Sequence, residues 1–229
     1  MLKLYDLAGA EDARRFSPYC WRARMALAHK GLEVETIPWR FTEKERIAPS
    51  GQGRVPVLVD GDKWIADSWT IANYLEDKYP DRPTLFGGPA GRALTRFYVG
   101  WADAALHAGI IRIVMLDIWR HVHPRDRDYF RKSREERFGK SLEAVVADRE
   151  KFLPAFRDSL TPLRLVLKAQ PFLGGDQPLQ ADYVVFGSFQ WARCISDFEL
   201  LSPEDPIHAW RGRILDLHGG LARKALAAA

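Results

Sequence analysis

The spacing of apolar residues changes once along this 229-residue chain, and that change restricts the folds open to it. Up to about residue 80, segments with strand periodicity alternate with helical ones, in the order strand, helix, strand, helix, strand, strand, helix. After Pro89 every periodic segment has helical spacing, and a proline- and glycine-rich stretch separates the two parts. We therefore predict an α/β domain over residues 1–80, a linker over 81–90 and an all-α domain over 91–229.

The same periodicity places the individual elements. Strands are expected at residues 2–7, 33–41, 55–59 and 63–66. Helices are expected at residues 18–30, 68–79, 92–120, 142–156, 162–169, 181–195 and 210–225, with a short polar helix or loop at 42–48. A bend is expected at Pro154, and the helix over 181–195 is expected to be buried.

A four-residue segment that follows the first strand, Ser17-Pro18-Tyr19-Cys20, resembles the thiol-redox motif Cys-Pro-Tyr-Cys with serine in place of the first cysteine. Serine cannot form a mixed disulfide, so a sulfur active there must come from a bound thiol, which points to glutathione. Ser17 is the expected N-cap of the following helix, with Pro18 at the first helical position. Unpaired N–H groups and the positive helix end favour a thiolate at this place. The structural alternative is that Ser17 is only a helix cap.

Two later segments have the character of ligand anchors. Val55-Pro56 opens a strand with a proline, which removes a ladder donor. If that peptide bond is cis, the backbone N–H and C=O of Val55 are free to pair with an extended peptide. Asp67-Ser68 precedes a helix, and Ser68 is expected at or near its N-cap, where hydroxyl, amides and helix dipole hold a carboxylate.

Charge and composition exclude several classes of function. The net charge of +4 is mild, and acidic residues break up the positive charge of the stretch 121–137, so we predict a solvated face and no nucleic-acid partner. His121 and His123 lack further ligands at a suitable spacing, so no metal site is predicted. The two cysteines form no disulfide framework, and we expect no leader and no membrane-spanning segment. These features predict a cytoplasmic protein.

Taken in order, Ser17-Pro18-Tyr19 with Arg22, the segment 54–58, and Asp67-Ser68 with Ile71 and Tyr74 resemble the glutathione site of cytosolic glutathione transferases. The resemblance implies a thioredoxin-like N-terminal domain followed by an all-α C-terminal domain, glutathione as cofactor, and a homodimer. It also implies site roles: Ser17 stabilises the thiolate, Val55 pairs with the cysteinyl backbone ahead of cis-Pro56, and Asp67 and Ser68 bind the γ-glutamyl end. Candidates for the glycyl carboxylate, by charge and position, are Arg40, Lys44 and Arg54.

A finer resemblance joins residues 16–31, 54–57, 67–69, 76–83 and 172–178. These segments are similar to the fungal-type A class, which includes bacterial β-etherases that use glutathione to cleave β-aryl ethers of lignin-derived aromatics. One departure concerns the helix over 181–195, where Leu179 occupies the position of the usual Ser, Thr or Asn cap, three residues before Asp182. An incomplete capping box predicts reduced local stability there.

The resemblance implies a second-substrate pocket between the domains for a small hydrophobic aromatic electrophile. Candidate lining residues are Trp39, Phe41, Trp101, Ile111, Met115 and Trp119. The function predicted is a glutathione transferase acting in detoxification or aromatic catabolism, with β-ether cleavage as a narrower form. Two alternatives stay open: a glutathione-dependent thiol reductase that uses Cys20, and a non-catalytic transferase-like binding protein.

Overall fold

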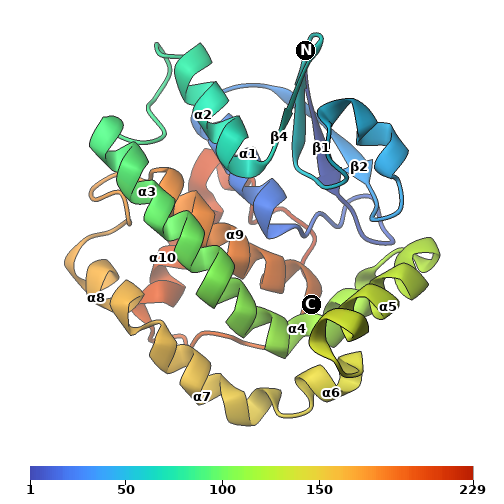
Figure 1. The fold of residues 1–229 in the computed structure, drawn as a ribbon. Coiled ribbons are helices and arrows are strands. Elements are labelled where there is room, and N and C mark those ends of the chain that lie inside the picture. Colours follow the sequence, from blue (N-terminus) through green and yellow to red (C-terminus); the bar gives the residue numbers. More distant parts are fainter. Residues whose placement is uncertain (229) are drawn as a thin grey trace.

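The computed structural model describes residues 1–228. The N-terminal part is a four-stranded mixed sheet with strand order β2-β1-β3-β4, flanked by helices (Figure 1). Strands β1 and β2 are parallel, while β3 is antiparallel to both β1 and β4. The elements are β1 (Leu2–Leu7), α1 (Pro18–His29), β2 (Val34–Trp39), the 3₁₀ helix η1 (Lys44–Ser50), β3 (Val57–Asp60), β4 (Lys63–Ala66) and α2 (Ser68–Lys78).

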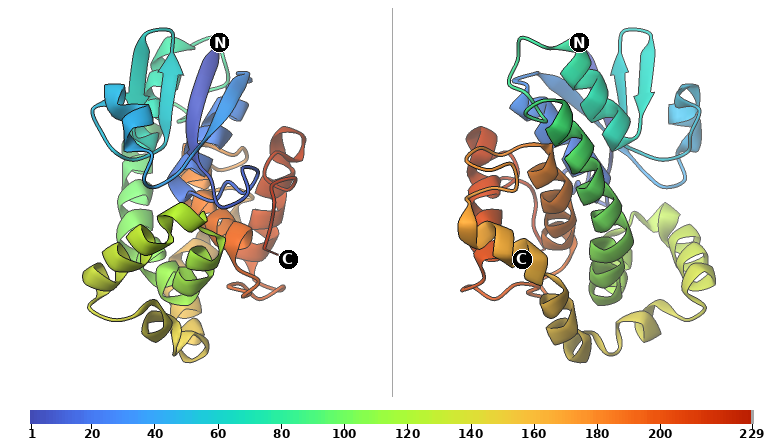
Figure 2. Two further views of the ribbon diagram at one scale, coloured as in Figure 1. Left: turned by 90° about the vertical axis from the view of Figure 1, so that its right-hand side faces the viewer. Right: turned by 60° about the vertical axis from the view of Figure 1, so that its left-hand side comes forward.

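The remainder of the described chain is helical and lies below the sheet in the view of Figure 1. Its central element is α9 (Gln180–Ile195), which is buried along nearly its whole length and packs against α1. Figure 2 shows the other helices arranged around it. They are α3 (Pro89–Trp101), a π-helical segment η2 (Ala102–Leu106), α4 (His107–His121), the 3₁₀ helix η3 (Pro124–Asp126), α5 (Arg127–Phe138), α6 (Leu142–Val146), α7 (Arg149–Ser159), α8 (Thr161–Ala169) and α10 (Pro206–Gly220).

This architecture confirms the predicted fold class, a thioredoxin-like α/β part followed by an all-α part. The predicted domain 91–229 ends on residue 229, which lies outside the described residues. Three helix predictions were wrong in detail. The helix expected over 142–156 is two helices that separate at residues 147–148, and Pro154 lies within the second of them. The charged stretch 121–137 contains the unpredicted helix α5, and the last helix spans 206–220.

The start of α9 lacks a side-chain hydrogen bond from its N-cap Leu179, as the sequence predicts, and Asp182 compensates for it. Asp182 is fully buried, and its Oδ2 accepts hydrogen bonds from the backbone N–H groups of Leu179 and Gly174, both at 3.0 Å. Its Oδ1 accepts from the N–H of Leu173 at 2.7 Å and from the indole Nε1 of Trp210 at 2.8 Å. One carboxylate therefore satisfies four donors, and the missing hydroxyl at Leu179 leaves the cap intact.

One helical stretch, Pro89–His121, is long and apolar enough to cross a membrane by length and composition, contrary to the expectation that the chain has none. Its most apolar window has a mean hydropathy of 1.4, and half of that window is buried inside the protein. Ile110, Val114 and Ile118 on this stretch lie in the core. The apolar composition therefore serves core packing, since a buried core helix meets the same criterion.

Candidate functional site

Ser17 is the N-cap of α1, as the sequence predicts. Its backbone is extended, with φ −62° and ψ 126°, and its Oγ accepts a hydrogen bond from the N–H of Cys20 at 3.3 Å. Pro18 occupies the first helical position, where the lack of an N–H costs no hydrogen bond. The side chain is only 4% exposed, so the hydroxyl lies close to the positive end of the helix in a largely desolvated place.

A short loop after β1 places Ser17 beside the carboxyl end of that strand. Gly9 N–H donates to Arg14 C=O at 3.0 Å, and Ala8 forms an antiparallel bridge with Arg15. Ser17 follows two residues later, so it lies beside the carboxyl end of β1. This position, at the end of a central strand and the start of a helix, is typical of ligand sites in α/β folds.

The second and third predicted anchors meet at the same end of the sheet. Tyr5 pairs with Val57 on β3, and Val57 pairs with Ala66 on β4. Pro56 and Asp67 are the adjoining residues, and the Asp67 N–H donates to the Pro56 C=O at 3.2 Å. The Val55–Pro56 peptide bond is cis. The three anchors, far apart in sequence, therefore converge at one end of the sheet.

The sequence predicts Ser68 at or near the N-cap of α2, and the structure places it directly after the cap. Asp67, rather than Ser68, is the N-cap, and its Oδ1 accepts from the N–H groups of Trp69 at 2.8 Å and Thr70 at 3.2 Å. Asp67 adopts φ 77°, a left-handed conformation that Asp tolerates better than most residues. Ser68 is buried and begins the helix. The exposed Asp67 carboxylate and the helix start thus stand together, next to the Pro56 segment.

Cys20 has the wrong environment for a nucleophile. It is completely buried, and burial, followed by the charge of Asp6, raises the pKa of its thiol well above its usual range. A reactive cysteine needs a lowered pKa and access to substrate. The structure therefore contradicts the alternative in which Cys20 attacks as a thiol reductase.

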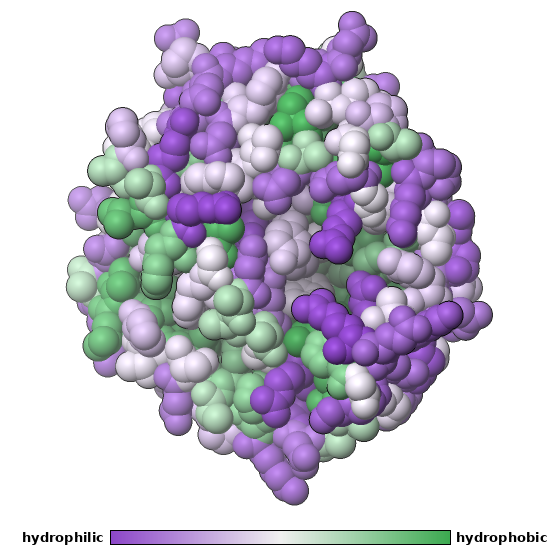
Figure 3. All heavy atoms as spheres, in the orientation of Figure 1, coloured by the Kyte–Doolittle hydropathy of each residue, from purple (hydrophilic) through white to green (hydrophobic). Residues whose placement is uncertain are grey.

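Contacts between the two parts of the chain surround the start of α1. Gly187 on α9 lies so close to Pro18 that a Cβ atom added there would be 2.4 Å from the Pro18 carbonyl oxygen. Arg22, 1% exposed, forms an ion pair with Asp103 of the π-helical segment at 2.8 Å. The surface is hollowed where the two parts meet, in front of the start of α1, with hydrophilic side chains at its rim (Figure 3).

The three cationic residues predicted to bind the glycyl carboxylate differ in the partners that their side chains have in the structure. Arg40 forms an ion pair with Asp12, which occupies its guanidinium. Lys44 is exposed and places its Nζ 5.6 Å from the centre of the Tyr129 ring on α5. Arg54 is exposed, and within residues 1–228 it has no ion-pair partner. Lys44 likewise has no ion-pair partner within residues 1–228, so Lys44 and Arg54 are both able to take a new carboxylate.

The residues predicted to line the substrate pocket fall into two groups according to their burial. Trp39 is 2% exposed, and its indole N–H donates to the Glu43 C=O at 2.6 Å, while Met115 is completely buried. Both belong to the core, and such burial leaves them no surface for a substrate, contrary to the prediction. The other four candidates, Phe41, Trp101, Ile111 and Trp119, are partly exposed and pack against the core.

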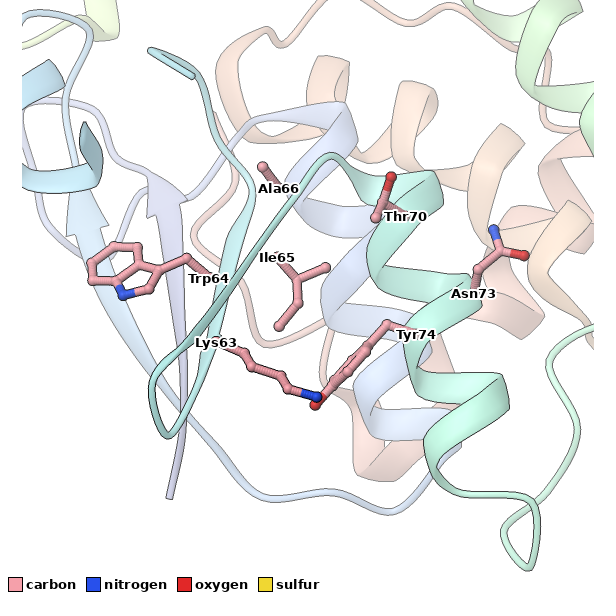
Figure 4. Close-up of a pocket in the computed structure, with 7 residues that line it drawn as sticks. All are labelled: Lys63, Trp64, Ile65, Ala66, Thr70, Asn73 and Tyr74. Atoms are coloured by element: carbon pink, nitrogen blue, oxygen red, sulfur yellow. The ribbon is translucent and has the colours of Figure 1, made fainter. Parts of the chain in front are cut away.

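Two cavities adjoin α2, and Ser17 lines neither of them. One, of about 540 Å³, lies between β4 and α2, where Ile65 points toward the helix and Trp64 points away (Figure 4). The other, of about 700 Å³, lies between α2 and α3 and includes Trp69, Arg92 and Arg96 in its lining. No group of three or more His, Cys, Asp or Glu side chains that could hold a metal occurs within residues 1–228.

Two models of known protein families match the chain, one for each part. The glutathione S-transferase N-terminal domain matches residues 13–83, and the glutathione S-transferase C-terminal domain matches residues 93–228. The chain belongs to the glutathione S-transferase family. The N-terminal domain of this family binds glutathione, which confirms, at the level of the family, the cofactor predicted from the sequence.

Solved structures of glutathione transferases share the fold over nearly the whole chain. A glutathione transferase of Phanerochaete chrysosporium is 27% identical with a TM-score of 0.77, and the match covers 97% of this chain and 93% of that one. A glutathione S-transferase of Ceriporiopsis subvermispora, solved in complex with glutathione, is 24% identical with a TM-score of 0.79, covering 95% and 96%.

A zeta-class glutathione S-transferase of Euphorbia esula is 43% identical over 70 residues, which are 28% of this chain and 31% of that protein. The chain thus spans about a third of the length of the curated relatives it matches at this level of identity.

The residues at the convergent anchors fit the chemistry of glutathione. Ser17 offers a hydroxyl at a positive helix end for a sulfur anion, and Arg54 offers a free cation for a carboxylate. Val55 precedes β3, and within residues 1–228 its backbone N–H and C=O pair with no other group, so they are available to an extended peptide. The carboxylate of Asp67 suits an ammonium group.

Proposed function

We propose that the chain is a glutathione transferase that activates the glutathione thiolate with Ser17 for attack on hydrophobic aromatic electrophiles. The convergence of Ser17, the cis-Pro56 segment and the Asp67 cap at one end of the sheet is the observation that supports this proposal. Glutathione, when bound, supplies the sulfur nucleophile. The residues of this chain bind it, orient it and stabilise its anionic form.

Each anchor has a distinct task in this proposal. The Ser17 hydroxyl donates a hydrogen bond to the sulfur anion, and the start of α1 adds the favourable dipole. The backbone of Val55 pairs with the cysteinyl part of the tripeptide. Asp67 and the helix start at Ser68 hold the γ-glutamyl end, and Arg54 holds the glycyl carboxylate. Orientation of the nucleophile beside the electrophile then lowers the barrier.

The decisive experiment removes the hydroxyl with Ser17→Ala. We expect the apparent pKa of the bound thiol to rise and turnover to fall by about 10- to 100-fold, the low range for one positioned donor. Ser141→Ala is a matched control, because Ser141 also caps a helix, accepting from Ala144 N–H at 3.2 Å. Equal kinetics in the two variants would refute the role of Ser17.

The substrate range is a narrower proposal. We propose membership of the fungal-type class and cleavage of β-aryl ethers, in a cytoplasmic role in detoxification or aromatic catabolism. The support is the similarity to fungal transferase structures and the partly exposed aromatic residues Phe41, Trp101 and Trp119 near the predicted pocket. A turnover screen with a nitroaromatic acceptor and a β-aryl ether ketone, which follows both conjugate and released phenol, tests it. Activity on the nitroaromatic alone would restrict the protein to general conjugation.

A homodimer is the assembly we propose. Leu94 and Phe97 on α3 are each 68% exposed, and they lie on the helix that borders the 700 Å³ cavity next to α2. A second copy would remove these apolar side chains from water. Sedimentation of the wild type should give a dimer, and Phe97→Glu should shift it toward monomer.

A further inference from the structure

Tyr19 is a hydroxyl-bearing residue next to the predicted thiolate site with no role in the functions above. It is the second residue of α1, two positions after Ser17, and it is partly exposed. Its ring faces the helical part of the chain: the His107 ring meets it edge-on, with centres 5.2 Å apart and planes at 84°. Tyr19 therefore lies where the two parts of the chain meet.

The Tyr19 ring is held from both parts of the molecule. The Arg22 guanidinium lies 4.7 Å from its centre, and Arg22 is fixed by its ion pair with Asp103. His107 is fixed in turn by an edge-on contact with the Trp191 ring, with centres 5.6 Å apart. A ring confined in this way holds its hydroxyl in one place, which is the requirement for a positioned donor.

The hydroxyl itself is free to bind a ligand. Within residues 1–228 it has no hydrogen-bond partner, and it is not among the fully buried polar atoms without partners, so it keeps contact with solvent. Burial of the ring, and then the charge of Asp103, raises the pKa of Tyr19 above its usual range. The hydroxyl therefore stays protonated at neutral and mildly alkaline pH and acts as a donor.

Charges of both signs act on this donor. Arg54, before the cis-Pro56 segment, and Arg137, on α5, both act on the Tyr19 hydroxyl and both also act on Arg134. Arg134 stacks on Phe41 and Phe130, with distances of 5.2 and 4.4 Å to the ring centres. The positive charges of Arg54 and Arg137 favour negative charge beside Tyr19, whereas the charge of Asp103 opposes it.

We propose that the Tyr19 hydroxyl is a catalytic hydrogen-bond donor to an oxygen leaving group of the electrophile, so that the preferred electrophiles are those that release an aryloxide. The inference rests on the proposed transferase function. As the carbon–sulfur bond to glutathione forms, the carbon–oxygen bond breaks, and its electron pair goes to the departing oxygen. The aryloxide leaves and takes a proton from water. Arg22 and His107 are positioning residues, because they act by holding the Tyr19 ring.

The test compares two acceptors with one carbon framework, a phenacyl aryl ether and phenacyl chloride, which differ in the leaving group. Tyr19→Phe should lower kcat/KM for the ether by about 10- to 100-fold and leave the rate with the chloride within about twofold, because chloride needs no donor. The loss should grow as the leaving phenol becomes less acidic. Glutathione affinity, measured by calorimetry, should not change.

Tyr98→Phe, which removes a partly buried hydroxyl from α3, is the matched control and should behave as the wild type. An equal loss with both acceptors, or no loss with the ether, would overturn the role of Tyr19. A wild type that consumes the chloride and never releases phenol would overturn the inference and leave the transferase function standing. A wild type that uses neither acceptor would overturn both.

Discussion

Gly187 on α9 offers a direct test of how the helical part of the chain positions the site. A Cβ at this residue would be 2.4 Å from the Pro18 carbonyl oxygen, where ordinary contacts begin near 3.4 Å. Gly187→Ala therefore forces α1 and α9 apart by about 1 Å, in an interior packed too densely to absorb the change. The displaced segment is the first turn of α1, which carries Ser17.

The magnitude follows from two opposing effects. Replacing glycine by alanine inside a helix stabilises it by about 1 kcal/mol. Overpacking at a close contact costs about 1–3 kcal/mol. Gly212→Ala on α10 isolates the first effect, because nothing lies within 4 Å of a Cβ there. The free energy of unfolding should therefore be lower in Gly187→Ala than in Gly212→Ala by about 1–3 kcal/mol.

Urea unfolding followed by fluorescence measures this difference, and thermal unfolding should separate the two midpoints by about 2–12 °C for a chain of this size. Gly187→Ala should also lose turnover with glutathione, because Ser17 moves with Pro18, while Gly212→Ala keeps it. Two variants of equal stability and equal activity would refute the claim that the approach of α9 sets the position of Ser17.

Two further predictions concern buried charge. Asp182→Asn should lower the free energy of unfolding by about 2–4 kcal/mol, because an amide cannot accept from all four buried donors. Asp176→Asn, in an exposed loop, is the control. Equal urea midpoints of the two variants would contradict the role of Asp182 as acceptor for four donors. Burial, and then the charge of Arg22, lowers the pKa of His107 to about 3. Below the ordinary histidine pKa near 6.5, His107 therefore binds more protons in the unfolded chain than in the folded one. The free energy of unfolding consequently falls as pH drops from about 6.5 toward 3, by about 2 kcal/mol at pH 5. His107→Phe should flatten this fall in unfolding measured from pH 7.5 to 5, and an unchanged slope would exclude His107 as its source.

Local signals explain what the sequence could predict. The Ser17 cap, the strand opened by Pro56 and the helix start at residues 67–68 each depend on a few neighbouring residues, so their patterns are visible without the fold. Even there, the choice between Asp67 and Ser68 as the cap depended on a left-handed backbone at Asp67, which the sequence does not specify.

Contacts between distant parts of the chain explain most of what the sequence could not predict. The break at residues 147–148 has no proline or glycine to mark it, and α5 carries charges without a continuous apolar stripe, so periodicity could detect neither. Gly139, with φ 66° at the end of α5, was the one local sign of that helix. Trp39 and Met115 were apolar at helical or strand spacing, which cannot separate a pocket wall from a core.

The contacts that the sequence could not predict at the first turn of α1 share one property, which is that they join the two parts of the chain. Tyr19 meets His107, Arg22 meets Asp103 and Pro18 meets Gly187. The first turn of α1 is therefore at once the cap that favours a thiolate and the surface on which the helical part packs. Because Ser17 is almost fully enclosed, a small shift of α9 changes the geometry at the sulfur without displacing the anchors at Val55 and Asp67. Substitutions along α9 that face α1 should consequently alter turnover more than glutathione affinity, whereas substitutions at Asp67 should do the reverse.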